Sequence, residues 1–189
     1  MKRTFIAIKL QPTEDLQRMM DCLQKNLEYE KRNINWCRLD QMHLTLKFIG
    51  ATPDEDIPKI TNAMQTLSQR HSSFEMQFDR TGVFGSNRSP RVLWLGMKNE
   101  PKVLYDLAND VLDTFDSIGY PRDRQNFVPH VTLCRIKHLI DKDFFFKLYN
   151  TIEQKPYIDI KVKEFSFLQS FLNPDGARYK TLKRFELKP

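Results

Sequence analysis

Cysteine is scarce in this chain of 189 residues: it has three, Cys22, Cys37 and Cys134, an odd number spread far apart. They form no CxxC pair and no zinc-ligand spacing, so the pattern indicates neither a zinc site nor a disulfide framework. Free thiols are typical of proteins in a reducing compartment. We therefore expect a cytoplasmic protein.

Long apolar runs are also missing. None approaches the roughly 20 residues that a membrane span needs. The apolar stretch in the opening "MKRTFIAIKL" is too short for a secretory signal, so we expect neither export nor membrane attachment. Acidic residues are outnumbered, 24 against 30 lysines and arginines, which gives a net charge of +6. A basic balance favours polyanionic partners, with nucleic acid first among them.

Strand and helix patterns follow one another along the whole chain. Alternating or short apolar runs predict strands at residues 4–10, 33–39, 42–50, 74–85, 91–97, 127–136, 157–172 and 178–187, with a turn at "NPDG". Helices are expected after Pro12, from a capping-box sequence at 52–55 or from Pro58, after Pro101, and over 141–152. Hairpin-like strand pairs set among helices predict an α+β fold with largely antiparallel sheets. With no visible linker, we expect residues 1–189 to form one domain made of two similar lobes.

One phrase occurs twice, as "HLTLKFI" at 43–49 and "HVTLCRI" at 130–136, in a chain with only four histidines. On a strand, alternate side chains share a face. Strict alternation therefore places His43, Thr45 and Lys47 on one face, with the aliphatic residues on the other. The same rule places His130, Thr132 and Cys134 together, and we expect Cys134 to be a small apolar filler rather than a reactive thiol.

Two imidazoles facing each other suit phosphodiester cleavage, which needs a base to activate the attacking oxygen and an acid to protonate the leaving oxygen. Imidazole can do both near neutral pH, since its unperturbed pKa is about 6.5. The threonine hydroxyls and nearby cations would hold the phosphoryl oxygens, and no metal or cofactor is required. The alternative is two satisfied histidines on duplicated strands, with threonine present for its strand preference. Duplication alone, however, does not require polar His and Thr in both copies.

The two phrases resemble the paired HxTx motifs of the two-histidine (2H) phosphoesterase superfamily. The chain is most similar to the RNA 2′,3′-cyclic phosphodiesterase family, historically called 2′-5′ RNA ligases. Its "RTFIAIKL", "HLTLKFIG", "RVLWLGM" and "FVPHVTLCRI" segments carry the resemblance. The family implies a bilobal, pseudo-two-fold fold of two largely antiparallel sheets with outer helices, and a central cleft that holds both histidines.

The resemblance also implies roles for individual residues. His43 would be the proton donor and His130 the proton acceptor, while Thr45 and Thr132 would hold the phosphate. Arg135 matches a substrate-site arginine, and Phe48 a residue that would stack on a base. Both have the wrong strand parity for the histidine face, so a bulge or strand end must re-aim them.

The implied reaction is metal-independent hydrolysis of RNA 2′,3′-cyclic phosphate ends to 2′-phosphomonoesters. Two alternatives stay open: the reverse reaction, which is 2′-5′ ligation, and a non-catalytic RNA-binding module. The partner would be RNA with a 2′,3′-cyclic phosphate terminus or a small cyclic nucleotide, and we expect a monomer. From the residues alone, either histidine could be the acid, and the natural RNA is not identified.

Overall fold

The structure is a computed structural model that describes residues 1–121, 126–173 and 176–189. Within these ranges, two short 3-10 turns, Glu28–Glu30 and Leu39–Gln41, precede the second and third strands. The strands and helices are, in chain order, β1 (Lys2–Lys9), α1 (Glu14–Asn26), β2 (Ile34–Trp36), β3 (His43–Thr52), α2 (Asp56–Ser68), β4 (Phe74–Phe78), β5 (Arg80–Ser86), β6 (Ser89–Gly96), α3 (Lys102–Ser117), β7 (Val131–Ile136), α4 (Lys142–Tyr149), β8 (Ile158–Val162), β9 (Glu164–Asn173) and β10 (Gly176–Glu186).

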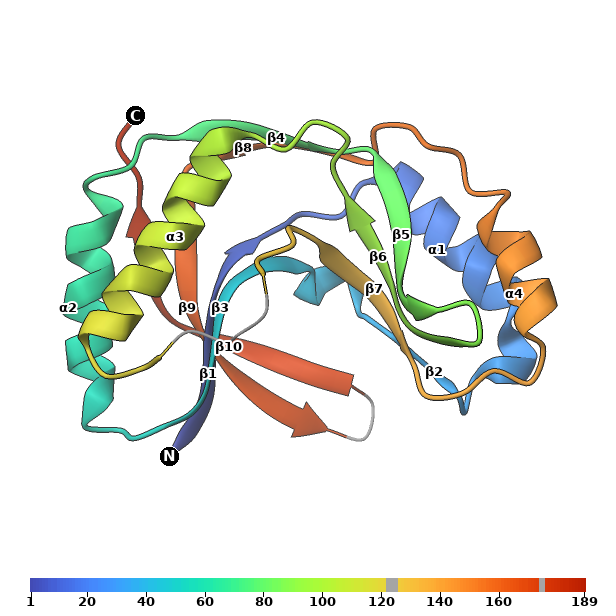
Figure 1. Ribbon diagram of the computed structural model, residues 1–189, viewed down its shortest axis with the longest axis horizontal. Helices are drawn as coiled ribbons and strands as arrows, with labels where there is room; N and C mark the ends of the chain where they lie inside the picture. Colours follow the sequence, from blue (N-terminus) through green and yellow to red (C-terminus); the bar gives the residue numbers. More distant parts are fainter. Residues whose placement is uncertain (122–125, 174–175) are drawn as a thin grey trace.

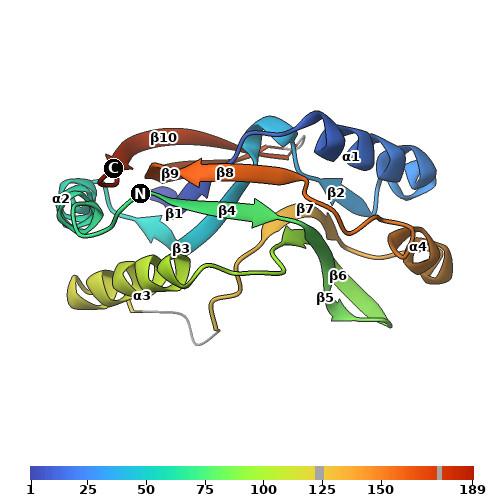
Figure 2. The same cartoon turned by 90° about the horizontal axis from the view of Figure 1, so that it is seen from above.

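Two lobes of similar make-up stand side by side, each with four strands and two helices among the described residues (Figure 1). The first lobe holds β1, β3, β9 and β10 with α2 and α3, and the second holds β2, β5, β6 and β7 with α1 and α4. Figure 2 shows the helix pairs at opposite ends of the molecule. The expected α+β bilobal fold is confirmed.

The strands of the described ranges form two antiparallel sheets. The larger has the order β10-β9-β1-β3-β7-β6-β5, with β2 also pairing with β7, and the smaller pairs β4 with β8. The lobes meet in the larger sheet between β3 and β7, where the structure records one pair of opposed residues, Leu44 and Val131. The two histidine phrases therefore lie side by side, as antiparallel neighbours, at the junction of the lobes.

The helices begin and pack largely as their sequences predict. Thr13 caps α1 by accepting a hydrogen bond from the backbone N–H of Leu16 at 3.2 Å. The expected capping box before α2 does not form, because the Thr52 hydroxyl is engaged with that of Thr4 on β1, 2.5 Å away. The apolar positions at helical spacing are buried: Leu16, Met20 and Leu23 in α1, and Ile60, Met64 and Leu67 in α2.

Residues 157–172, expected as one long strand, are divided in two. The chain leaves β8 at Val162 and resumes as β9 at Glu164, so that each part joins a different sheet. In the expected "NPDG" turn, Pro174 and Asp175 lie outside the described residues. No helix in the described part of the chain is long and apolar enough to cross a membrane.

Of the five β-bulges in the described strands, three lie in β3 and β7 and change the direction of side chains near the lobe junction. Relative to β1, strand β3 has one extra residue at Leu46 and another at Ile49. Relative to β6, strand β7 has one extra residue at Leu133. An extra residue interrupts the alternation of side chains between the two faces. Simple alternation therefore fails just beyond each His-Thr pair.

Candidate active site

Four polar side chains surround the Leu44–Val131 pair. Leu44 and Val131 are fully buried and face the core, so the residues on either side of each must face the other way. In the antiparallel arrangement this brings His43 beside Thr132, and Thr45 beside His130. One histidine and one threonine from each lobe thus share one surface of the large sheet, which we call the site face.

Both imidazoles are held in the same way. His43 Nδ1 lies 2.8 Å from the carbonyl oxygen of Gln41, and His130 Nδ1 lies 2.7 Å from that of Val128. A carbonyl oxygen can only accept, so each Nδ1 carries the hydrogen. This fixes the tautomer and leaves Nε2 of each neutral ring with a lone pair. The two nitrogens can therefore each accept a proton, or donate one once protonated.

Each imidazole also packs in a cluster with two aromatic rings that contact each other. The His43 ring is 5.0 Å from that of Phe5 and 4.9 Å from that of Tyr179, measured between centroids. The His130 ring is 4.8 Å from that of Phe84 and 6.5 Å from that of Trp94. These neighbours hold the rings in place. Sequence reasoning missed this arrangement, because Phe5 and Tyr179 lie near opposite ends of the chain.

Burial and nearby positive charge lower the pKa of both site histidines. Burial lowers the pKa of His43, and the charges of Arg135 and His130 lower it further. Burial and the charge of Arg135 likewise lower the pKa of His130. The backbone carbonyls oppose these effects without cancelling them. Both imidazoles are therefore largely neutral at pH 7 in the absence of a bound anion.

Arg135 and Phe48 lie on the site face because bulges redirect them. Arg135 follows the extra residue Leu133, and its charge reaches both imidazoles, as the pKa shifts show. Phe48 follows the extra residue Leu46 and is paired with Phe5, which contacts His43. We expected a bulge or a strand end to redirect each of the two side chains, and the structure has a bulge before each.

The same bulges overturn the predicted positions of Lys47 and Cys134. Lys47 turns to the core face, where it is 4% exposed and its Nζ donates to the carbonyl oxygen of Pro121 at 2.9 Å. Cys134 is fully buried in the hydrophobic core. Burial raises the pKa of its thiol to about 12, so the thiol stays protonated and unreactive.

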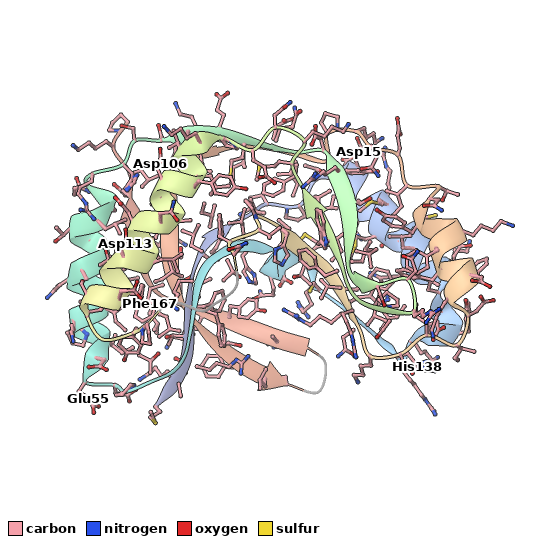
Figure 3. The ribbon with its side chains drawn as sticks, in the orientation of Figure 1. Asp15, Glu55, Asp106, Asp113, His138 and Phe167 are labelled. Atoms are coloured by element: carbon pink, nitrogen blue, oxygen red, sulfur yellow. The ribbon has the colours of Figure 1, made fainter. Side chains whose placement is uncertain are left out.

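Thr45 and Thr132 are partly exposed on the site face. Within the described ranges, neither hydroxyl makes a hydrogen bond to another residue. Both are thus available to a bound group. The other two histidines lie elsewhere: His71 bonds the Asp110 carboxylate at 2.9 Å, and His138 sits in the exposed loop after β7 (Figure 3). No three metal-binding side chains come together in the part of the chain that the structure describes.

Comparison with known proteins gives a consistent result. A family model described as LigT-like phosphoesterase matches residues 10–94. The RNA 2′,3′-cyclic phosphodiesterase of Thermotoga maritima is 31% identical over 180 residues, 95% of this chain and 92% of the relative. The protein of the same name from Methanothermobacter thermautotrophicus is 28% identical over 185 residues, 98% of both chains. The crystal structure of the Thermus thermophilus protein TT0787 superposes with a TM-score of 0.76 at 25% identity, over 98% of both chains.

Proposed function

This chain belongs to the LigT-like phosphoesterase family, and from that premise we propose that it hydrolyses RNA ends carrying a 2′,3′-cyclic phosphate. The product would be a 2′-phosphomonoester. The observation that supports this best is the antiparallel pairing of the two His-Thr phrases at Leu44 and Val131. This pairing presents two imidazoles and two free hydroxyls on one face. The curated relatives described above are named for the same activity.

In the proposed reaction, His130 Nε2 accepts a proton from a water molecule as the water oxygen attacks phosphorus. The bond between phosphorus and O3′ breaks while protonated His43 Nε2 donates its proton to O3′. In-line displacement places the attacking and leaving oxygens on opposite sides of phosphorus. A base and an acid held on two different lobes can therefore serve the two oxygens at once. The roles of His43 as donor and His130 as acceptor follow the order of the motifs in the family.

The remaining polar groups would bind the phosphate. Thr45 and Thr132 would donate hydrogen bonds to its non-bridging oxygens, and Arg135 would stabilise the charge that develops there. Phe48 would offer its ring to a base. The negative charge of the cyclic phosphate raises the pKa of a neighbouring imidazole, opposing the effects of burial and Arg135. Substrate binding thus favours the singly protonated pair that the reaction needs.

The test is an RNA oligomer ending in a 2′,3′-cyclic phosphate, incubated with the protein and a chelator. We expect a 2′-phosphomonoester, identified by separation from the 3′ isomer. His43→Ala and His130→Ala should each lower the rate by about 10²- to 10⁴-fold. His138→Ala is the matched control, since this exposed histidine lies outside the site.

Other outcomes would point elsewhere. Near-normal turnover by both histidine variants would refute the assignment. A longer product in the presence of a 5′-hydroxyl RNA would indicate 2′-5′ ligation. Salt-sensitive RNA binding with no product would indicate a binding module.

We further propose that the chain acts as one domain and as a monomer, in the cytoplasm. All the candidate site residues come from a single chain, and Cys22, Cys37 and Cys134 are free thiols. Light scattering across a range of concentrations, in the presence and absence of reductant, checks the oligomeric state.

A further inference from the structure

The site face continues beyond the histidines along β1. Ala7 is opposite Thr45 and Phe5 is opposite Phe48, and Arg3 is the next residue of β1 on the same face. The guanidinium carbon of Arg3 lies 4.7 Å from the centroid of the Phe48 ring, in a cation–π contact. At about 3.3 Å per strand residue, Arg3 lies roughly 13 Å along β1 from the position beside Thr45.

Arg3 keeps its charge available for a ligand. Within the described ranges, no acidic side chain pairs with it. Its neighbour Lys2 points to the opposite face, where it is bonded to Asp54 at 2.5 Å. On the far side of the site face, Arg80 is paired with Glu100 at 3.5 Å. An RNA chain that leaves the histidines therefore meets an unpaired guanidinium at Arg3, whereas that of Arg80 is already paired.

Aromatic rings connect Arg3 to the catalytic centre. Phe48 is 41% exposed, so part of its ring is accessible to a ligand. Tyr179 contacts both Phe5 and His43; burial raises the pKa of its phenol, and the charge of Arg3 opposes that effect. A cation beside an exposed aromatic ring and a partly exposed one is the combination that binds single-stranded RNA, through phosphate pairing and base stacking.

We propose that Arg3, Phe48 and Tyr179 form a subsite for the nucleotides immediately 5′ of the cyclic phosphate, so that the enzyme prefers RNA oligomers to single cyclic nucleotides. The inference rests on the proposed function, because only an RNA end held at the histidines places its 5′ neighbours here. At about 3.4 Å per stacked nucleotide, the distance to Arg3 corresponds to no more than about four nucleotides. A pentanucleotide therefore spans the subsite, and a cyclic mononucleotide does not.

The experiment compares kcat/KM for a pentanucleotide ending in a 2′,3′-cyclic phosphate with that for 2′,3′-cyclic AMP. We expect Arg3→Ala to lower the ratio of the two values about tenfold or more, as the loss of one charge-assisted hydrogen bond does. Arg3→Lys, which keeps the charge but loses the planar fork, should give an intermediate ratio. Lys2→Ala is the matched control, because it removes the same charge from the adjacent residue on the opposite face.

Binding of a pentanucleotide that ends in a 2′-phosphate is measured in parallel at several salt concentrations. Loss of one phosphate contact should reduce the slope of log K against log salt by about 0.7 in Arg3→Ala. An unchanged ratio and slope in Arg3→Ala would overturn the proposal, as would an equal effect of Lys2→Ala. If the wild-type protein cleaved neither substrate, the proposed function would fail, and the binding arm alone would still decide the subsite.

Discussion

Replacing Gly82 by alanine should disturb both the fold and the site, because Gly82 lies under the indole of Trp94. An ideal Cβ built on Gly82 would be 2.1 Å from Trp94 Cζ2, and 2.5 Å from both Cε2 and Cη2. Ordinary contacts at a Cβ begin at 3.4 Å. The backbone of Gly82 is not in the left-handed region, so alanine suits its conformation and only the clash opposes it.

The magnitude follows from this geometry. The indole must move by about 1.3 Å, the difference between 3.4 and 2.1 Å. Overpacking of this kind typically costs about 1–3 kcal/mol in the free energy of unfolding. Trp94 contacts His130 and packs against Phe84, so the shift is passed on to the imidazole. A displacement near 1 Å at a reacting group can lower the rate by about 10²-fold.

The clash can be separated from other effects by a double-mutant cycle with Trp94→Leu, which removes the offending ring atoms. In that background, Gly82→Ala should be neutral or stabilising by up to about 1 kcal/mol, because alanine restricts the unfolded chain. Urea unfolding of the four proteins gives the coupling, and turnover of the cyclic-phosphate RNA gives the effect on the site. An unfolding midpoint equal to wild type in Gly82→Ala, or the same loss in both backgrounds, would refute the reasoning.

Three other changes have defined outcomes. Arg135→Ala removes the charge that lowers the pKa of both site imidazoles, so both pKa values should rise in an NMR titration, while Arg135→Lys should keep them lowered. In native protein a thiol reagent should modify exposed Cys22 but not Cys134, whose labelling should require unfolding; prompt labelling of both, seen by peptide mass spectrometry, would contradict the buried position. Glu30 is fully buried and accepts three N–H hydrogen bonds, so Glu30→Ala should cost about 3 kcal/mol or more in urea unfolding, and Glu30→Gln, which keeps one acceptor, should cost less.

Much of the fold could be predicted from periodicity and from the repeated phrase. The helical spacing of apolar residues located α1, α2 and α3 to within a few residues. The phrase identified His43, Thr45, His130 and Thr132, because polar residues recurring at fixed places on apolar strands are unusual. The structure brings these four residues together, and their catalytic roles stay a prediction.

The rest depends on pairings between distant strands. Strict alternation placed Lys47 and Cys134 beside the histidines, and the predicted face was wrong for both, although Cys134 is the apolar filler that we expected. A bulge appears only when a strand is set against its partner, and the partners of β3 and β7 lie elsewhere in the chain. The same limit hid the contact between Tyr179 and His43, which requires β10 to be in place.

The junction at Leu44 and Val131 has the symmetry of an isologous dimer contact, since each lobe offers the other the same short phrase. In the protein alone the two imidazoles are held nearly alike, because each Nδ1 donates to a backbone carbonyl oxygen. In the proposed reaction the ligand is unsymmetrical, since one ester oxygen leaves and one water molecule attacks. That asymmetry would make one imidazole the proton donor and the other the proton acceptor.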